Sequence, residues 1–451
     1  MSFQNIQTQL ESEFNAFQAT LNGSANSAFN QKRKQAFDHF KSKGFPSTKH
    51  EDWKYSSLKK VDKQSFTFPK EVKSISSDSI FPKISGHRIV FVNGQYSEEL
   101  SDNFENAKIE ILTLKDAQVH KSEFLNEYYG KHLNLEKDSV AAANIAMAND
   151  GIVVHIPKNT TLESPLTIHF VSNTEDENIA LNLHNLVVVE QNAEVKIVEI
   201  YETLGDKAAF ENYVTEVFVG EDARVDYYKI QEENNQSSHI GTTQIYQEKK
   251  SYFYAATISL NGGFIRNDLN LILDGEYIES HMFGLYIPNE SQHIDNHTLV
   301  DHRKPNCESN ELYKGVLSDQ STGVFNGKIF VQQDAQKTNA YQNCRNVITS
   351  DSASMNSKPQ LEIWADDVKC SHGTTTGKLN DEAIFYMQSR GIPKPDAIRL
   401  QLVAFAEDVV SQIKIEELRE ILDERIEQNC NNSGAQYQRN QKSVSDSSSG
   451  D

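Results

Sequence analysis

Residues 187–195 read Val-Val-Val-Glu-Gln-Asn-Ala-Glu-Val, and residues 217–225 repeat the pattern as Val-Phe-Val-Gly-Glu-Asp-Ala-Arg-Val. Each stretch has three apolar residues, a short polar turn, an alanine, one variable residue and a final apolar residue. A third version spans 347–355, and looser ones span 154–162 and 271–278. The first two copies begin 30 residues apart, as expected of a chain that coils and stacks similar strand-and-turn units. The recurrence indicates a β-solenoid, most simply a β-helix, with the small alanine pointing into a crowded interior.

The sequence around these repeats favours strands through the middle of the chain. From about 85 to 376, short runs of β-branched and aromatic residues are broken by Asn, Asp, Gly and Ser, with hardly any helix-length apolar period. We therefore predict a mainly β core over residues 85–376. A β-sandwich is the alternative, because it also uses many short strands, but it does not require recurring corners.

The amino-terminal segment has the pattern of helices. Its apolar residues recur at helical spacing as Ile6, Leu10, Phe14, Phe17, Leu21, Phe29, Phe37 and Phe40. Gly44 and Pro46 end this pattern, so we expect a helical region and a linker over residues 1–84. The linker contains His50-Glu51-Asp52-Trp53-Lys54-Tyr55, which we interpret as a loop held to the core by the indole ring.

Helical signals return in residues 377–429. Asn380 can cap a first helix that ends at Arg390-Gly391 and has Ile384, Phe385 and Met387 on its apolar face. Pro395 suits the first turn of a second helix, and a third is expected from about 416 to 427. Residues 430–451 are polar and poor in apolar side chains, which predicts a disordered tail.

Composition limits the possible functions. The chain has 451 residues, with 64 acidic against 44 basic residues and a formal charge of −20, and no long basic run offsets this charge. We therefore expect no general affinity for nucleic acid. The four cysteines form no CxxC pair, the amino terminus lacks the features of a secretory signal, and no apolar run reaches membrane-spanning length. These features favour a soluble cytoplasmic protein with reduced thiols and no membrane partner.

Residues 370–380 resemble a phosphate-binding loop only superficially. They read Cys-Ser-His-Gly-Thr-Thr-Thr-Gly-Lys-Leu-Asn. Such a loop needs four residues between its glycines and a Ser or Thr directly after its lysine. Here three residues separate Gly373 from Gly377, and Leu379 follows Lys378. Neither condition is met, so if ATP serves this protein, we expect another chain to hydrolyse it.

One possible metal site comprises His293, His297, His302 and Cys307. All four residue types can bind metal, but His293 and His297 would share a face as a preformed zinc pair only on a helix, and the sequence after them resembles a strand. Surface and turn histidines are the simpler interpretation.

A second group joins Cys344, Cys370 and His372. A thiolate is a soft ligand for iron and a neutral imidazole is a borderline one, so these residues could hold or pass iron and sulfur. Cys344 precedes His372 by 28 residues, about one coil of a solenoid, so the two can lie on one face. A cysteine protease is an alternative, but the local sequence of a papain-type or caspase-type nucleophile is absent. Inert buried cysteines are the other alternative.

Several segments together resemble a known family. Residues 357–392, SKPQLEIWADDVKCSHGTTTGKLNDEAIFYMQSRGI, are similar to the carboxy-terminal signature of SufD, within the SufB/SufD family of iron–sulfur cluster assembly proteins. The blocks VDHRKPNCESNELYKG at 300–315, GVFNGKIFV at 323–331 and QKTNAYQNCRN at 336–346 look like consecutive segments of the same family. The stretch HEDWKY resembles its amino-terminal Glu-x-Trp-Lys-Tyr segment. Together these blocks cover most of the chain from about 50 to 425.

The resemblance implies a right-handed parallel β-helix between helical amino- and carboxy-terminal regions. It also implies a non-catalytic scaffold that pairs with SufB through the β-helices and binds the ATPase SufC through its carboxy-terminal helices. His372 would lie at the junction with SufB and bind transient iron or a nascent cluster, with Cys344 and Cys370 as weaker candidates. No tightly bound cofactor is implied, although flavin binding is associated with the assembled complex.

Two details bear on the branch of the family. SufB resembles Glu-His-Glu where this chain has Ser371-His372-Gly373, and SufB carries an additional cysteine-rich amino-terminal region that is absent here, so SufD is the better match. Cys344 departs from this assignment, because it stands where SufB-type sequences have their cluster-building cysteine. Its role as a second ligand or as a passive substitution stays open.

Two other functions are compatible with a β-helix. A carbohydrate-active enzyme would use paired carboxylates, yet the adjacent Asp366 and Asp367 would point to opposite faces of a strand. The other possibility is a purely structural partner of SufB that never contacts iron.

Overall fold

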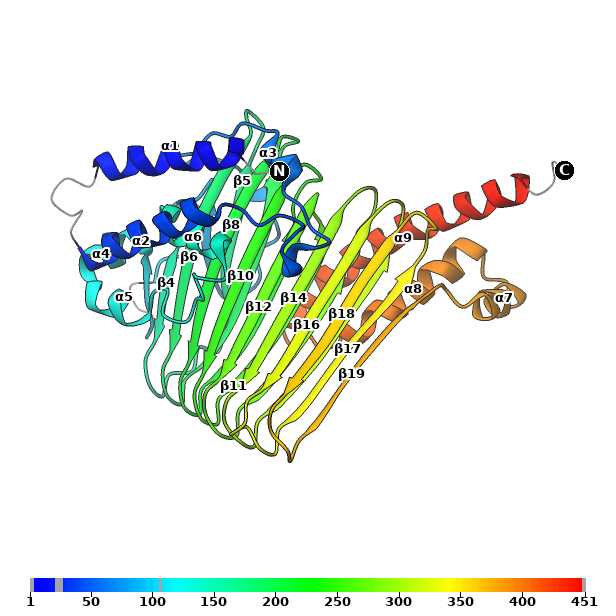
Figure 1. Cartoon of the computed structure of the whole chain (residues 1–451). Coiled ribbons are helices and arrows are strands. Elements are labelled where there is room, and N and C mark those ends of the chain that lie inside the picture. Colours follow the sequence, from blue (N-terminus) through cyan, green and yellow to red (C-terminus); the bar gives the residue numbers. More distant parts are fainter. Residues whose placement is uncertain (1–3, 21–26, 105–107, 448–451) are drawn as a thin grey trace.

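The computed structural model describes residues 4–20, 27–104 and 108–447 and shows a β-solenoid with helices at both ends of the chain (Figure 1). The nine-stranded sheet contains, in sequence order, β3 (Glu110–Thr113), β4 (Ile152–Ile156), β6 (Ile179–Val189), β8 (Ala209–Val219), β10 (Ser238–Gln247), β12 (Phe264–Leu273), β14 (His293–His302), β16 (Thr322–Val331) and β18 (Ser354–Ile363). The ten-stranded sheet contains β1 (His87–Val92), β2 (Gln95–Tyr96), β5 (Leu166–Asn173), β7 (Glu194–Leu204), β9 (Arg224–Glu232), β11 (Tyr252–Asn261), β13 (Glu279–Tyr286), β15 (Glu308–Leu317), β17 (Asn339–Ile348) and β19 (Lys369–Gly377).

From β4 onward the strands alternate between the two sheets, so each coil contributes one strand to each sheet. Strands of successive coils pair in parallel, and within the described residues only β1–β2 and β3–β4 pair antiparallel. The mainly β solenoid predicted from the repeats is therefore confirmed, and the β-sandwich alternative is wrong.

The corner pattern has a direct structural basis. Asn192 and Asp222 adopt the left-handed backbone conformation, each with φ of 57°, and each donates its N–H to a carbonyl of the next coil. Ala193 and Ala223, which follow them, are buried in the interior. A larger side chain at either alanine would have to displace packed core atoms, because protein interiors are close-packed. The copy at 347–355 joins β17 to β18, so the pattern occurs at the opposite edge of the solenoid as well.

The amino-terminal helices cover the nine-stranded sheet (Figure 1). The covering elements are α1 (Gln4–Thr20), α2 (Ala28–Lys43), η2 (Glu51–Trp53) and α3 (Lys59–Asp62), whereas η3 (Ser77–Ser79) is followed by Ile80, which packs on the ten-stranded sheet. The predicted apolar faces are confirmed at Ile6, Leu10, Phe14, Phe37 and Phe40, which are buried. Helix α2 ends before Gly44, whose φ of 66° suits glycine. Leu21 lies outside the described residues.

Three helices lie where we expected strands, namely α4 (Leu114–His120), α5 (Ser122–Tyr128) and α6 (Ser139–Met147). Asp138 caps α6 by accepting hydrogen bonds from the backbone N–H groups of Val140 and Ala141. Every residue from Val140 to Met147 is buried, so this alanine-rich helix has no polar face. A helix without a polar face shows no amphipathic period, which explains why the sequence pattern did not reveal it.

The carboxy-terminal helices α7 (Asp381–Ser389), α8 (Lys394–Val410) and α9 (Glu416–Ser447) follow the solenoid, and α8 and α9 pack on the ten-stranded sheet (Figure 1). The Asn380 cap and the position of Pro395 in the first turn of α8 are confirmed. Phe385 was expected on the apolar face of α7, but its side chain is 73% exposed. Only Ile384 of that helix is fully buried, because a single side of α7 meets the protein.

The expectation of a disordered tail over residues 430–451 is also corrected. Helix α9 continues through residue 430 to Ser447, and residues 448–451 lie outside the described residues. The segment from 431 to 447 contains no proline, so nothing in it forces the helix to end. The start of α9 is anchored by the buried Leu418, Leu422, Ile426 and Cys430.

Candidate functional site: the open end of the solenoid

The last coil leaves the solenoid open at one end. Within the described residues, β19 pairs with β17 alone among the strands of its sheet, and β18 pairs with β16 alone. Each of these two strands therefore presents one edge without a strand partner. Such edges readily pair with strands of another chain.

Three sequence-predicted site residues lie on the same face at this end. Side chains alternate along a strand, and the even-numbered residues of β17 are the buried ones that face the interior. Cys344 belongs to this set, and the parallel register places Cys370 and His372 of β19 on the same face. The structure thus brings the three residues to one inner face, as the coil spacing predicted.

His372 is the exposed member of the group. It pairs in register with Gln342, whose side chain is buried and donates a hydrogen bond of 2.8 Å from Nε2 to Glu311 Oε2. No further coil covers His372, so its imidazole is accessible while its backbone is fixed by the β17–β19 ladder. The residues 370–380 that resembled a phosphate-binding loop lie mainly on this strand rather than on a loop that opens a helix.

The two thiols differ in accessibility. Cys370 is half-buried and pairs in register with Ala340, and burial raises its pKa above the usual value. Cys344 is fully buried, accepts a hydrogen bond of 3.4 Å from Asn346 Nδ2, and burial raises its pKa to about 11. A hydrogen bond of 2.9 Å between Ser357 Oγ and Thr374 Oγ1 links β18 to β19 across the end of the interior.

This arrangement is an incomplete ligand set. The three potential ligand atoms of Cys344, Cys370 and His372 do not converge within 4.8 Å of one another, whereas one other group among the described residues does. His372 can offer one nitrogen and Cys370 one sulfur to an ion at the open end, so further ligands have to come from another molecule. The geometry therefore suits a site that is shared between two chains.

Comparison with known protein families identifies the family of this chain. Residues 170–405 match the family model of the SUF system FeS cluster assembly SufBD core domain, and residues 4–168 match the SufBD protein N-terminal region. The chain belongs to the SufBD family.

Several curated members of the SufBD family are similar over most of this chain. The iron-sulfur cluster assembly SufBD family protein slr0076 of Synechocystis sp. is 32% identical over 427 residues, which cover 92% of this chain and 94% of the relative. The iron-sulfur cluster assembly protein SufD of Escherichia coli is 30% identical over 392 residues, 85% of this chain and 89% of its own length. SufD of Bacillus subtilis is 28% identical over 332 residues, which cover 72% and 74% of the two chains.

The other histidine group of this SufBD-family chain is not a single site. His293 and His297 share the outer face of β14, where His297 Nε2 lies 2.9 Å from Asp295 Oδ1. His302 faces the interior and hydrogen-bonds to Ser309 Oγ, and burial lowers its pKa to about 3. Cys307 is buried at a corner, and its thiol donates to the carbonyl of Gly275. The interpretation of these histidines as separate surface and turn residues is closer to the structure than a single metal site is, although His302 is a core residue.

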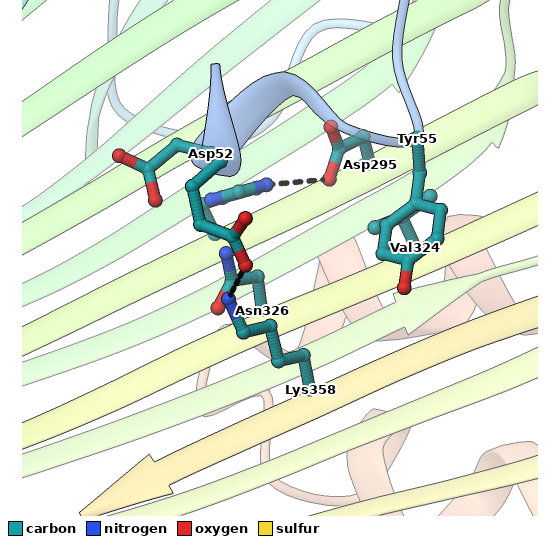
Figure 2. Close-up of a pocket in the computed structure, with 8 residues that line it drawn as sticks. Asp52, Tyr55, Asp295, Val324, Asn326 and Lys358 are labelled. Carbon is teal, nitrogen blue, oxygen red and sulfur yellow. Dashed lines mark hydrogen bonds and ion pairs between the residues drawn. The ribbon is translucent and has the colours of Figure 1, made fainter. Parts of the chain in front are cut away.

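The Glu-x-Trp-Lys-Tyr segment of the family lies across the outer face of the nine-stranded sheet. Trp53 is buried, and the guanidinium of Arg266 stacks 4.1 Å from the centre of its ring, which confirms the predicted anchor. Beneath this segment lies a cavity of about 10 Å³, lined by Glu51, Asp52, Tyr55, Asp295, His297, Val324, Asn326 and Lys358 (Figure 2). It can hold at most a single water molecule, so it is too small to be a substrate site. The Glu51–Lys358 ion pair joins the segment to β18 of the last coil.

Sequence reasoning missed one chemically distinctive group in this SufBD-family solenoid, formed by Glu211, Glu233 and His239 in the interior. Glu211 and His239 are register partners 28 residues apart, the same separation that links Cys344 with His372. The coil interval is the one sequence signal that links this pair, but it does not fix the register, because coil length varies along the chain. Glu211 is also one of two glutamates of β8, and its residue type does not distinguish it from Glu216.

Within residues 4–20, 27–104 and 108–447, no helix combines the length and the apolar content that are needed to cross a bilayer.

Proposed function

We propose that this chain is a SufD-type scaffold subunit of the SUF assembly machinery. In this proposal it catalyses no reaction itself, works in the cytoplasm, and assists iron entry or cluster formation at a junction with SufB. Family membership supports the general role in iron–sulfur cluster assembly. The SufD-type assignment rests on the relatives named SufD and on Ser371-His372-Gly373 in this chain.

The open end of the solenoid is the expected junction with SufB. The free edges of β18 and β19 can continue their backbone ladders onto strands of a partner. The exposed Trp364, 65% accessible, lies directly after β18 and adds an apolar contact of the kind enriched at protein interfaces.

The observation that carries the proposal is the position of His372 on the inner face of the last coil, exposed at the open end of the solenoid. Its imidazole would bind iron or a nascent cluster together with ligands from SufB, while Cys370 is a second candidate. Cys344 is the weakest candidate, because burial disfavours the thiolate that binds metal. Iron is the cargo of this site, and flavin binding by the assembled complex stays a prediction from the resemblance.

The carboxy-terminal helices are the expected docking site for the ATPase SufC, which would carry out ATP hydrolysis. Phe385 and Tyr386 of α7 are 73% and 59% exposed on consecutive positions. Two adjacent exposed aromatic rings on one helix suit a protein-binding surface, because aromatic residues dominate interface hot spots.

The decisive experiment reconstitutes the full chain with SufB and SufC and follows cluster formation from Fe²⁺ and sulfide under anaerobic conditions. We expect His372→Ala to lower the rate at least tenfold while gel filtration still shows the intact complex. His120→Ala, which removes an exposed histidine of α4 far from the open end along the chain, is the matched control and should leave the rate unchanged.

Undiminished cluster formation by an intact His372→Ala complex would reject the ligand role and favour the purely structural partner. Failure of SufB to associate with the wild-type chain would reject the scaffold proposal as a whole. A polysaccharide-active enzyme would instead be active without any partner, and family membership gives no support to that alternative.

A further inference from the structure

The group of Glu211, Glu233 and His239 lies deep in the solenoid, remote along the coil order from the open end. Glu211 is on β8, His239 is its register partner on β10, and Glu233 follows β9 of the opposite sheet. All three side chains are buried, with exposed fractions of 2% for Glu211 and 0% for the other two. Both sheets therefore direct ionisable groups toward one point in the interior.

The distances within this group are those of a compact triangle. His239 Nδ1 lies 2.7 Å from Glu233 Oε1 and 3.6 Å from Glu211 Oε2. The ligand atoms of all three residues lie within 4.8 Å of one another. Ligand atoms that bind one metal ion at about 2.1 Å lie ~3–3.5 Å from one another, so the triangle needs only small side-chain adjustments to hold an ion.

Two carboxylate oxygens of this group lack partners. Ser172 Oγ donates to Glu211 Oε1, yet Glu211 Oε2 and Glu233 Oε2 accept no hydrogen bond from any described residue. Both carboxyl groups lie in the fully buried interior, where two unpaired negative charges are costly. A cation between the two carboxylates would give both oxygens a partner and would neutralise their negative charge.

The imidazole is closely surrounded on the sides that do not face the carboxyl groups. Gly241, the next inward residue after His239, has no side chain, and a Cβ there would come within 2.7 Å of His239 Nε2 and 2.8 Å of Lys229 Nζ. The rings of Tyr201 and Tyr213 pack against His239 on its other sides. Lys229 is the one cation that faces the group among the described residues, and burial lowers its pKa although Glu199, Glu233 and Asp268 oppose this shift.

We propose that Glu211, Glu233 and His239 form an internal binding site for one first-row divalent metal ion. Two carboxylates and one imidazole are a ligand set that suits Fe²⁺, Mn²⁺ or Zn²⁺, and the site contains no sulfur. The site differs from the proposed junction at His372 in position, ligands and accessibility, and it does not depend on SufB. An ion enclosed in this way would serve the solenoid as a structural centre.

The test uses the full chain expressed in medium supplemented separately with Fe²⁺, Mn²⁺ or Zn²⁺, kept anaerobic for iron and desalted before metal analysis. All samples carry His372→Ala and Cys370→Ser, so that the open end contributes no metal. We expect about one equivalent of one of these metals per chain, at least a fivefold loss in E211Q/E233Q, and no loss in E311Q. Glu311 is the matched control because it is also a fully buried interior glutamate.

X-ray absorption at the metal edge provides a second readout on the protein without the E211Q/E233Q changes. We expect nitrogen and oxygen neighbours with the multiple-scattering signature of one imidazole and no sulfur. Less than one tenth of an equivalent of every metal, equal retention by E211Q/E233Q, or a sulfur neighbour would each overturn the proposal. If E211Q/E233Q does not fold, metal retention by the single variant E233Q and the absorption spectrum still test the proposed metal site. None of these outcomes depends on cluster assembly activity.

Discussion

Cys344 of β17 and Thr374 of β19 occupy the same register position, so the last coil lies directly over the thiol. Thr374 is further held by its hydrogen bond to Ser357, which closes the space above Cys344 from the side of β18. His372 lies two residues before Thr374, on the exposed part of the same face. The group that could bind iron is thus accessible, and the thiol that resembles the SufB cysteine is covered.

This relationship predicts the reactivity of the thiols. At pH 7.5 we expect iodoacetamide to modify Cys370 in the folded chain and to modify Cys307, Cys344 and Cys430 at least tenfold more slowly. Burial raises the pKa of the first two of these slow thiols to about 11 and that of Cys430 to about 12, and only the thiolate reacts. Mass spectrometry of peptides over time gives the rates, and denatured protein, in which all four react, is the control. Cys344 reacting as fast as Cys370 would contradict the covered position.

The exposed aromatic residues of α7 predict a defect in partner binding without a defect in stability. Phe385→Ala should weaken capture of the ATPase at least tenfold, because it removes a large apolar contact. The free energy of unfolding of the chain should change by less than about 0.5 kcal/mol, since Phe385 makes little contact with its own protein. Val119→Ala, which shortens a side chain that is 74% exposed on α4, is the matched control for surface hydrophobicity. Unchanged capture by Phe385→Ala would place the docking surface elsewhere.

Asp295 predicts a change in acid stability. Burial alone would raise the pKa of this carboxyl, but the charges of His297 and Arg266, with hydrogen bonds from His297 and Ser56, hold the pKa well below its usual range. A carboxyl with a lowered folded-state pKa stabilises the fold above its unfolded pKa, and this stabilisation is lost as the pH falls further. Asp295→Asn should therefore lower the free energy of unfolding at pH 7 by ~2–4 kcal/mol, with the difference shrinking below about pH 4.

Urea titrations at pH 7, 5 and 3 measure this difference. Asp366→Asn, at an exposed position between β18 and β19, is the control and should change stability little at any of the three pH values. A constant deficit in Asp295→Asn from pH 7 to pH 3 would show that the loss is not electrostatic.

Glu311 predicts the opposite pH dependence. Burial raises its pKa to about 7 despite a hydrogen bond from Gln342, so the folded state binds a proton that the unfolded state releases near pH 4. Stability contributed by this proton is present at low pH and is lost as the pH rises through 7. Glu311→Gln should raise the free energy of unfolding on the order of 1–3 kcal/mol at pH 8.5 and change it little at pH 4. Glu163→Gln, at an exposed position, is the control; equal effects of Glu311→Gln at both pH values would contradict the assignment.

The solenoid could be predicted because its corners are specified locally. At the corners of the first two repeats a residue in the left-handed conformation, such as Asn192, is followed by a small residue that is buried in the interior, such as Ala193. This local pattern repeats along the chain. The caps of α2 and α7 could be predicted for the same reason, since Gly44 and Asn380 act within one turn of their helices. The common inner face of Cys344, Cys370 and His372 agrees with the coil spacing, whereas their role in binding iron stays a prediction from the resemblance.

The exact contacts could not be predicted because coil length varies. Paired residues are 26 apart between Ser238 and Phe264 but 32 apart between Thr322 and Ser354. A shift of one residue moves a side chain to the other face of its strand. Spacing alone therefore cannot predict that Glu211 pairs with His239 or that Thr374 covers Cys344. The buried helix α6 and the extension of α9 to Ser447 were missed because neither has an apolar stripe that alternates with polar residues.

The two bare edges at β18 and β19 also affect how the protein behaves when it is made in excess. Nothing in a stack of parallel coils limits its length. The free strand edges of a terminal coil can therefore pair through backbone hydrogen bonds with any compatible strand. Two copies meeting head to head would close into a symmetric pair, whereas repeated one-way addition would generate fibres. If a partner molecule covers these edges, as proposed above, its supply should limit self-association of the chain.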